Sequence, residues 1–195
     1  DANGNSGAGS CGRLAEVKAD ILNAFVKEHN VERVMEFGSG DGNQLSLCRF
    51  KKYTGFDVSH TRIRQTRKKF AGDAGKTFLH VDEYSGQTAE LSLSLDVIYH
   101  LIEDEVFEAY MQRLFTPAEK YVIIYASDPT TAELPEVAVP HVKHRDCLSW
   151  VRMHQKDWEC IKHIPNRYPI PKSAGSHDTL QDTSFSDFYI FSRKS

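Results

Sequence analysis

The chain has 195 residues, of which 40% are hydrophobic and 26% are charged, and its formal net charge at pH 7 is −3. A chain of this length buries one good core, so we expect a single domain. The slightly acidic balance is not typical of a dedicated nucleic-acid-binding protein. No run approaches 18 apolar residues, and nothing at the start resembles a signal peptide, so no membrane association is predicted. The four cysteines lack the spacing of a disulfide framework, which favours a reducing, cytoplasmic setting.

The hydrophobic pattern predicts a flexible Gly/Ser-rich arm over 1–12, followed by one domain over 13–195. In chain order, the predicted elements of that domain are a helix from Leu14 that stops at Asn30, strand 31–37, helix 43–50, strand 53–58, helix 60–70, strand 77–81, strand 91–99, helix 103–115, strand 121–125, helix 146–155, strand 158–164 and strand 188–191. Strands that alternate with helices at this spacing indicate an open, mostly parallel α/β sheet.

The stretch 34–42, Val-Met-Glu-Phe-Gly-Ser-Gly-Asp-Gly, is the most informative part of the chain. A buried strand turns abruptly into a glycine loop, where the absence of Cβ atoms lets a ligand lie against bare backbone. Glu36 stands just before the loop. Its charge indicates that the ligand presents a cationic or hydroxyl-rich group there rather than only phosphate.

Acidic residues end three successive predicted strands. They are Glu36, Asp57 and Asp82, and the pair Tyr99-His100 ends the fourth. In open α/β sheets, ligands bind outside the carboxyl ends of the strands, so we expect these residues to share one site. Asp57 lies 19 residues beyond Gly38, close to the separation at which a carboxylate reaches ribose hydroxyls in nucleotide-binding domains.

Three motifs together resemble those of class I S-adenosylmethionine-dependent methyltransferases. They are Glu-Phe-Gly-Ser-Gly-Asp-Gly (36–42), Gly-Phe-Asp-Val-Ser (55–59) and Leu-Asp-Val-Ile-Tyr-His-Leu-Ile-Glu-Asp (95–104), and the resemblance covers about residues 13–128. It implies a Rossmann-like α/β fold with a mostly parallel seven-stranded sheet, helices on both faces and an antiparallel last strand. The segment 188–191 is well placed to supply that strand.

The resemblance also implies S-adenosyl-L-methionine as the cofactor and assigns residues to it. Glu36 and the backbone of Gly38, Ser39 and Gly40 would hold its methionine portion, Asp57 would bind the ribose hydroxyls, Val58 would pack on the adenine, Asp82 with the backbone near Glu83 would reach the adenine amino group, and Tyr99, His100 and Leu101 would flank the methionine end. Arms similar to 4–10 fold over the cofactor in a subset of these enzymes; a disordered terminus is the alternative.

For the chemistry, the sulfonium already activates the methyl group, so alignment of the acceptor supplies much of the rate. A hydroxyl acceptor also benefits from a general base, for which His100 is the best candidate and His141 and His144 come next. We expect acceptor-binding elements within 129–184. Candidates there are His141, His144, Arg145, Trp150, Asn166, Arg167 and Tyr168. Asp96, inside the fourth predicted strand, has a structural role in this interpretation.

We therefore predict a methyltransferase that acts on a hydroxyl of a small molecule or saccharide, and four alternatives stay open. An RNA methyltransferase is one, because the helix 60–70 has a basic face; the Asn-Pro-Pro-Tyr type of signature is nevertheless missing after the fourth strand. A protein that binds the cofactor without catalysis is the second. The third is an NAD(P)-dependent oxidoreductase, although the Gly38-x-Gly40-x-Gly42 spacing is one residue short of its fingerprint.

A zinc site is the fourth alternative. His141-x-x-His144-x-x-Cys147 and Cys160-x-x-His163 supply enough ligands on spacing alone. The Cys-x-x-Cys knuckle pattern is absent, however, and both cysteines fall on apolar sides of predicted elements, so we expect no metal. The oligomeric state is left open by the sequence.

Overall fold

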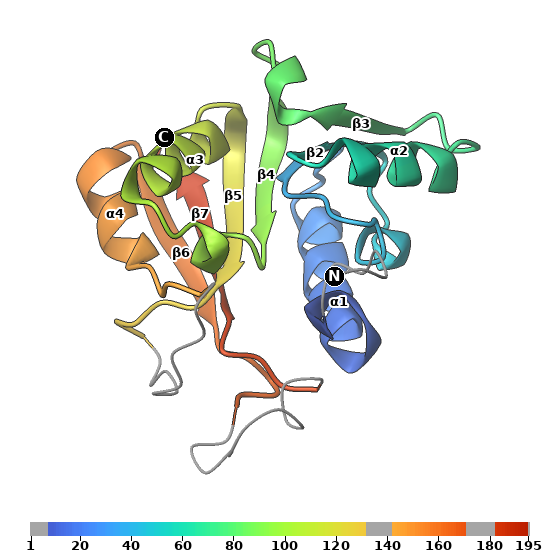
Figure 1. Cartoon of the computed structure of the whole chain (residues 1–195). Coiled ribbons are helices and arrows are strands. Elements are labelled where there is room, and N and C mark those ends of the chain that lie inside the picture. The colour runs from blue at the N-terminus through green and yellow to red at the C-terminus, as the bar shows by residue number, and fades with distance from the viewer. Residues whose placement is uncertain (1–7, 132–141, 171–181, 195) are drawn as a thin grey trace.

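The computed structural model describes residues 8–131, 142–170 and 182–194. Its centre is a seven-stranded sheet with the order β3-β2-β1-β4-β5-β7-β6 (Figure 1). The strands are β1 (Arg33–Phe37), β2 (Lys52–Asp57), β3 (Lys76–His80), β4 (Ala89–Leu95), β5 (Ala118–Ala126), β6 (Trp158–Ile164) and β7 (Asp187–Arg193). Strands β1 to β5 pair in parallel, whereas β7 runs antiparallel to both of its neighbours. The predicted sheet and its antiparallel last strand are confirmed.

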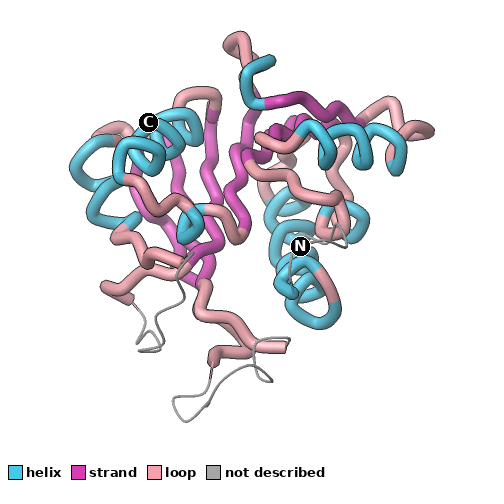
Figure 2. The backbone as a smooth tube through the Cα atoms, viewed as in Figure 1, coloured by secondary structure: helices cyan, strands magenta, loops and turns pink. Residues whose placement is uncertain are grey.

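Helices cover both faces of the sheet, as Figure 2 shows. Helices α1 (Gly12–Glu28) and α2 (His60–Lys69) pack on one face, and α3 (Asp104–Phe115) and α4 (Cys147–His154) on the other. Alternate strand residues serve the two cores: Val34 of β1 packs with Leu22 and Phe25 of α1, whereas Met35 packs with Met111 of α3. This alternation follows from the period of two in a strand.

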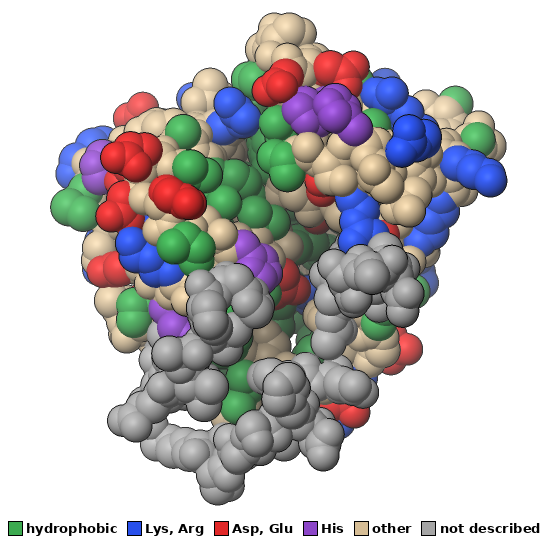
Figure 3. Space-filling view, in the orientation of Figure 1, with side chains coloured by type: hydrophobic (Ala, Val, Ile, Leu, Met, Phe, Trp, Pro, Cys, Tyr) green, Lys and Arg blue, Asp and Glu red, His purple; other side chains and the backbone are tan. Residues whose placement is uncertain are grey.

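The arrangement of β1 positions the site. This strand pairs with β2 on one side and β4 on the other, so the chain order reverses between β1 and β4. In open α/β sheets such a switch point opens a crevice beyond the carboxyl ends of the strands. In the space-filling view, the surface is hollowed between the half with α3 and α4 and the half with α1 and α2 (Figure 3).

Two predicted elements differ from the structure. The helix over 43–50 is wrong, because only a 3-10 turn, η2 (Leu45–Leu47), forms there. Asp41 Oδ1 accepts the backbone N–H of Asn43 and closes a local turn instead, while α1 covers the adjoining face of the sheet. The fourth strand ends at Leu95 rather than at residue 99, because Asp96 adopts a left-handed conformation with φ of 58°.

The residues after Asp96 form a second 3-10 turn, η4 (Ile98–His100). Further 3-10 turns are η1 (Ala8–Ser10), within the predicted arm, and η3 (Val81–Glu83), after β3. The other predicted helices and strands are present with ends shifted by a few residues. Among the described helices, none has the length and apolar character needed to cross a membrane.

Candidate active site

The glycine loop after β1 forms the floor of the site. The backbone N–H groups of Gly38 and Ser39 both donate to the Phe56 carbonyl, which anchors the loop to the end of β2. Gly38 and Gly40 have φ values of 88° and 58°, a region that favours glycine. A Cβ on Gly38 would also lie 2.4 Å from Cγ2 of Val97. The side chain of Ser39 packs toward Gly55, away from a ligand on the loop.

Glu36 is a buried acid beside this floor. Its Oε2 accepts a hydrogen bond of 2.5 Å from the hydroxyl of Tyr53, and the residue is 5% exposed. Burial raises the pKa of Glu36 to about 7, although the bond from Tyr53 and the charge of Lys18 oppose the rise. A buried carboxyl group whose ionisation is disfavoured is suited to a ligand that brings a positive charge.

Asp57, at the end of β2, holds the loop and the next helix together. One carboxylate oxygen accepts the backbone N–H of Gly40 and the other accepts that of Ser59, each at 2.9 Å. Ser59 in turn caps α2 by accepting the N–H of Arg62. Val58, beside Asp57, is 75% exposed, which is unusual for an apolar side chain and leaves its surface available to a flat apolar group.

Beyond β3, a histidine pair organises the neighbouring edge of the site. His80 Nε2 donates to the Val58 carbonyl at 3.0 Å, and the rings of His60 and His80 stack at 4.0 Å. The N–H of Asp82 donates to His80 Nδ1, while the Asp82 side chain is largely exposed. The carboxylate of Glu83 is already engaged by the backbone N–H of His80, so Glu83 has backbone groups rather than its side chain to offer.

A buried ion pair closes the end of β4. Lys18 Nζ donates to Asp96 Oδ2 at 2.6 Å, and Lys18 is 3% exposed. The other oxygen of Asp96 accepts from the hydroxyls of Tyr99 and Ser186. The arm lies against the same carboxylate, since a Cβ on Gly9 would be 2.8 Å from Oδ2. Described arm residues therefore pack at the site; residues 1–7 lie outside the described part of the chain.

An aromatic wall lies beyond β4 and β5. We define it as Tyr99, His144 and Phe185: the ring of Phe185 is edge-on to Tyr99 at 4.9 Å and to His144 at 5.1 Å. His144 Nδ1 lies 2.7 Å from the hydroxyl of Ser127, which follows β5. Burial lowers the pKa of His144 below its ordinary value. His100 adjoins the wall with its ring 4.6 Å from that of Tyr99, and it is exposed.

The two residues that flank His144 fix its position. Lys143 donates its backbone N–H to the Tyr99 carbonyl and its ammonium to Asp104. Arg145 donates to the Leu101 carbonyl and to Asp104. Lys143 and Arg145 thus clamp the segment to the start of α3, and Arg145, a predicted acceptor residue, has a structural role.

Described residues between β6 and β7 contact β5 and α1 beside the wall. Asn166 Nδ2 donates to the Tyr125 hydroxyl and the Ser186 carbonyl. The guanidinium of Arg13 lies 4.2 Å from the centre of the Tyr168 ring. Two predicted acceptor residues, Asn166 and Tyr168, therefore lie in the structure that surrounds the site.

Other predicted acceptor residues lie elsewhere. Trp150 is buried in the core, with Nε1 donating to Glu108, and Arg167 is exposed. His141 lies outside the described residues. The predicted zinc ligands that are described have other surroundings: Cys147 is buried, and His163 bonds Asp187. Within the described ranges, no cluster of three or more His, Cys, Asp or Glu residues has the arrangement of a metal site.

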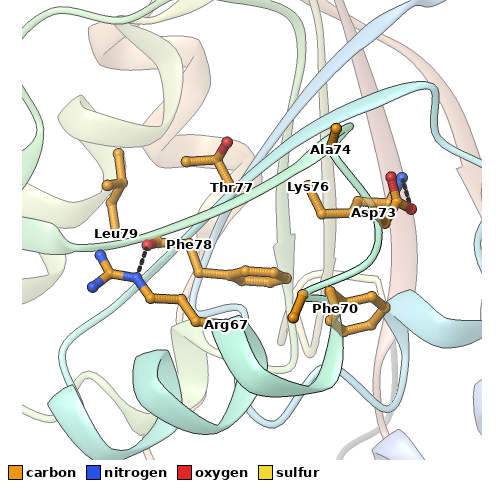
Figure 4. Close-up of a pocket in the computed structure, with 9 residues that line it drawn as sticks. Arg67, Phe70, Asp73, Ala74, Lys76, Thr77, Phe78 and Leu79 are labelled. Atoms are coloured by element: carbon orange, nitrogen blue, oxygen red, sulfur yellow. Dashed lines mark hydrogen bonds and ion pairs between the residues drawn. The ribbon is translucent and has the colours of Figure 1, made fainter.

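A cavity of about 350 Å³ lies away from this site, between α2 and the edge strand β3 (Figure 4). Phe70 and Phe78 line it, and Arg67 Nε donates to the Phe78 carbonyl at its rim. The bond from Arg67 and that from His80 N–H to Glu83 occupy outward backbone groups of β3. These contacts protect the sheet edge against pairing with another strand.

The site has several residues that the sequence analysis did not assign to it. Lys18, Tyr53, His80, Ser127 and Phe185 come from α1, β2, β3 and the connections after β5 and β6. The sequence predicts a structural role for Asp96; this residue does bind Lys18 of α1, but it also lies at the site. The sequence alone does not reveal that a lysine such as Lys18 is buried, because lysines on helices usually lie on the exposed face. Such a residue can be recognised only once the fold is known.

The strand order and the antiparallel β7 differ from the parallel 3-2-1-4-5-6 order of dinucleotide-binding domains. They are those of class I S-adenosylmethionine-dependent methyltransferases, and the chain has this fold. The fold implied by the three motifs is confirmed.

Comparisons with solved structures support this assignment. The methyltransferase domain of bacterial CtHen1 matches with a TM-score of 0.67 at 17% identity, covering 94% of this chain and 100% of that one. Magnesium protoporphyrin IX methyltransferase (ChlM) from Synechocystis PCC 6803, with bound S-adenosylhomocysteine, gives 0.66 at 15%, covering 92% and 83%. N-methyltransferase NodS from Bradyrhizobium japonicum WM9 gives 0.63 at 13%, covering 94% and 96%. No protein-family model and no curated protein matches the sequence.

Proposed function

We propose that the protein is an S-adenosylmethionine-dependent methyltransferase that methylates a hydroxyl group of an uncharged small molecule or saccharide. The observation that carries the proposal is the juxtaposition of two half-sites. A glycine floor with Glu36 and Asp57 lies at the ends of β1 and β2, and a wall with His144 lies at the ends of β4 and β5.

The first half-site suits the cofactor. Backbone without Cβ atoms at Gly38 and Gly40 admits its amino-acid portion, and Glu36 complements an α-ammonium. Asp57 suits the ribose hydroxyls, and exposed Val58 suits the adenine face. Asp82 and the Glu83 backbone lie at the edge assigned to the adenine amino group. When bound, the cofactor supplies an activated methyl group, while the protein supplies alignment and exclusion of water.

The second half-site suits acceptance of a proton. The lowered pKa of His144 keeps its imidazole neutral near pH 7. When Nδ1–H donates to Ser127, Nε2 carries the lone pair that can accept the proton of a hydroxyl. His100 is the other candidate base, exposed beside Tyr99. The half-buried position of His144 favours it over the exposed His100, and His141 stays a candidate outside the described residues.

The charges around the wall favour an uncharged acceptor. Among the described residues here, Lys143 and Arg145 are bound to Asp104, and Lys18 is bound to Asp96. The basic residues of α2 lie near β3 rather than at the wall, and several are engaged; Arg67, for example, pairs with Glu83. This supports the proposal over RNA methylation, which draws on phosphate contacts. The wall itself argues against a protein that only binds the cofactor. None of the four cysteines, all of them among the described residues, forms a disulfide, which supports a cytoplasmic location.

Calorimetry and a turnover assay test the proposal. The wild type should bind S-adenosylmethionine and S-adenosylhomocysteine, and Asp57→Ala should lose at least tenfold in affinity for both, as expected for hydrogen bonds to a charged group. In a screen of saccharides and phenols that detects S-adenosylhomocysteine, His144→Ala should lower turnover more than His100→Ala, with cofactor affinity kept. Absence of cofactor binding by the wild type, or unchanged affinity in Asp57→Ala, would contradict the proposal.

A further inference from the structure

Tyr53 is a buried tyrosine whose hydroxyl is directed at Glu36 rather than at solvent. It lies on β2, is 2% exposed, and stacks on Phe50 with the ring centres 5.9 Å apart. Burial and the neighbouring carboxyl group hold the pKa of Tyr53 well above its ordinary value, so the phenol stays protonated and donates its hydrogen bond at any physiological pH.

The contact between Tyr53 and Glu36 depends on a glycine. In the register of β1 and β2, Glu36 stands opposite Gly55, whereas Tyr53 stands opposite Val34. The Tyr53 side chain therefore reaches diagonally, past Gly55, to Glu36 on the same face of the sheet. A Cβ on Gly55 would lie 2.9 Å from Cε1 of Tyr53, so only glycine leaves this path open.

We infer that Tyr53 is a positioning residue for cofactor recognition: its hydroxyl fixes the Glu36 carboxylate so that this group receives the α-ammonium of S-adenosylmethionine. The inference rests on the proposed function. It assigns the tyrosine a role in selecting the amino-acid portion of the ligand, while the adenosine portion is bound elsewhere in the site. The hydrogen bond from Tyr53 to Oε2 restricts the orientation of the Glu36 carboxylate.

The ionisation of Glu36 gives this inference a pH signature. An ammonium ligand favours the ionised carboxylate, and burial raises the pKa of Glu36 to about 7, so binding should release a proton and strengthen as the pH rises through about 7. Removal of the Tyr53 bond should shift this rise to higher pH, since that bond lowers the pKa. The ionisable groups that face Glu36 electrostatically are Lys18, Cys48, Tyr53, Asp57, Asp96 and Tyr110.

The affinities for two ligands distinguish a role of Tyr53 in recognition from a merely structural one. S-adenosylhomocysteine has the α-ammonium, whereas 5′-methylthioadenosine has the adenosine and sulfur without the amino-acid portion. By calorimetry at pH 7, Tyr53→Phe should bind S-adenosylhomocysteine about tenfold more weakly and methylthioadenosine within about twofold of wild type. The matched control is Tyr121→Phe, which removes a hydroxyl directed at His29, and it should change neither affinity.

A double-mutant cycle and a second variant complete the test. In a Glu36→Gln background, Tyr53→Phe should have no further effect on the ratio of the two affinities. If Tyr53→Phe does not fold, Glu36→Asp, which draws the carboxylate away from the hydroxyl, should show the same selective loss. Equal weakening of both ligands, or no weakening of either, overturns the inference while leaving the proposed function intact. Failure of the wild type to bind either ligand overturns the proposed function itself.

Discussion

Lys18 Nζ lies 2.6 Å from Asp96 Oδ2, which ties the first helix to the residue that follows β4. Lys18 is 3% exposed and the Asp96 side chain is 20% exposed, so water screens the pair little. Asp96 also has a left-handed backbone, a conformation uncommon for residues with a side chain. One ion pair therefore joins α1 to the sharp turn that ends β4.

Removal of Lys18 should destabilise the protein. Lys18→Met leaves the Asp96 carboxylate without its cation, and loss of one partner of a buried pair costs about 3 kcal/mol. The free energy of unfolding, measured by urea titration, should fall by about this amount. Lys18→Met combined with Asp96→Asn should recover part of the loss, because no unpaired charge is then buried. A single variant as stable as wild type would show that the pair contributes nothing.

Gly38→Ala should damage both stability and binding. The new Cβ would lie 2.4 Å from Cγ2 of Val97, and the alanine would have to adopt a φ of 88°. We therefore expect the free energy of unfolding to fall by about 2 kcal/mol. The floor should shift with it, so affinity for S-adenosylhomocysteine should fall as well. Gly72→Ala is the matched control, because nothing lies within 4 Å of a Cβ there. Equal stability of the two variants would contradict the close approach to Val97.

His144 should titrate below the ordinary histidine pKa of 6.5. Its pKa is lowered because burial disfavours the imidazolium, so the ring is neutral above that range and takes up a proton only as the pH falls. In an NMR titration of the ring protons, one resonance with a midpoint below 6.5 should disappear in His144→Gln. If the resonance lost in this variant instead titrates at or above 6.5, His144 is more solvated than the structure shows.

The cofactor side of the site was largely predictable from the sequence, because its residues lie in continuous motifs. Glu36, Gly38 and Gly40 belong to one strand and its loop, and Asp57 ends the next strand. The connection of these motifs in parallel order followed from the alternation of strands and helices. The assigned roles stay predictions, but the structure brings these residues together at one edge.

The contacts that cross the chain were not predictable. Lys18 and Asp96 are 78 residues apart, and the aromatic wall combines residues from three separate segments. The same limit explains Trp150, whose place in the stretch after the fifth strand suggested an acceptor residue but whose ring faces the core. The helix expected over 43–50 failed for a local reason, since a side chain of the loop competes for its first N–H group.

The first helix has an implication for how the chain folds. Residues 12–28 leave the ribosome early, yet their partners arrive late: Asp96 binds Lys18, Tyr125 lies under its ammonium, and Tyr168 stacks on Arg13. Leu22 and Phe25 can pack on β1 as soon as that strand forms, because Val34 follows them closely in the chain. The polar contacts that hold α1 at the end of β4 and beside Tyr168 need the later segments, so we expect this part of helix docking to be completed late in assembly, as the site itself forms.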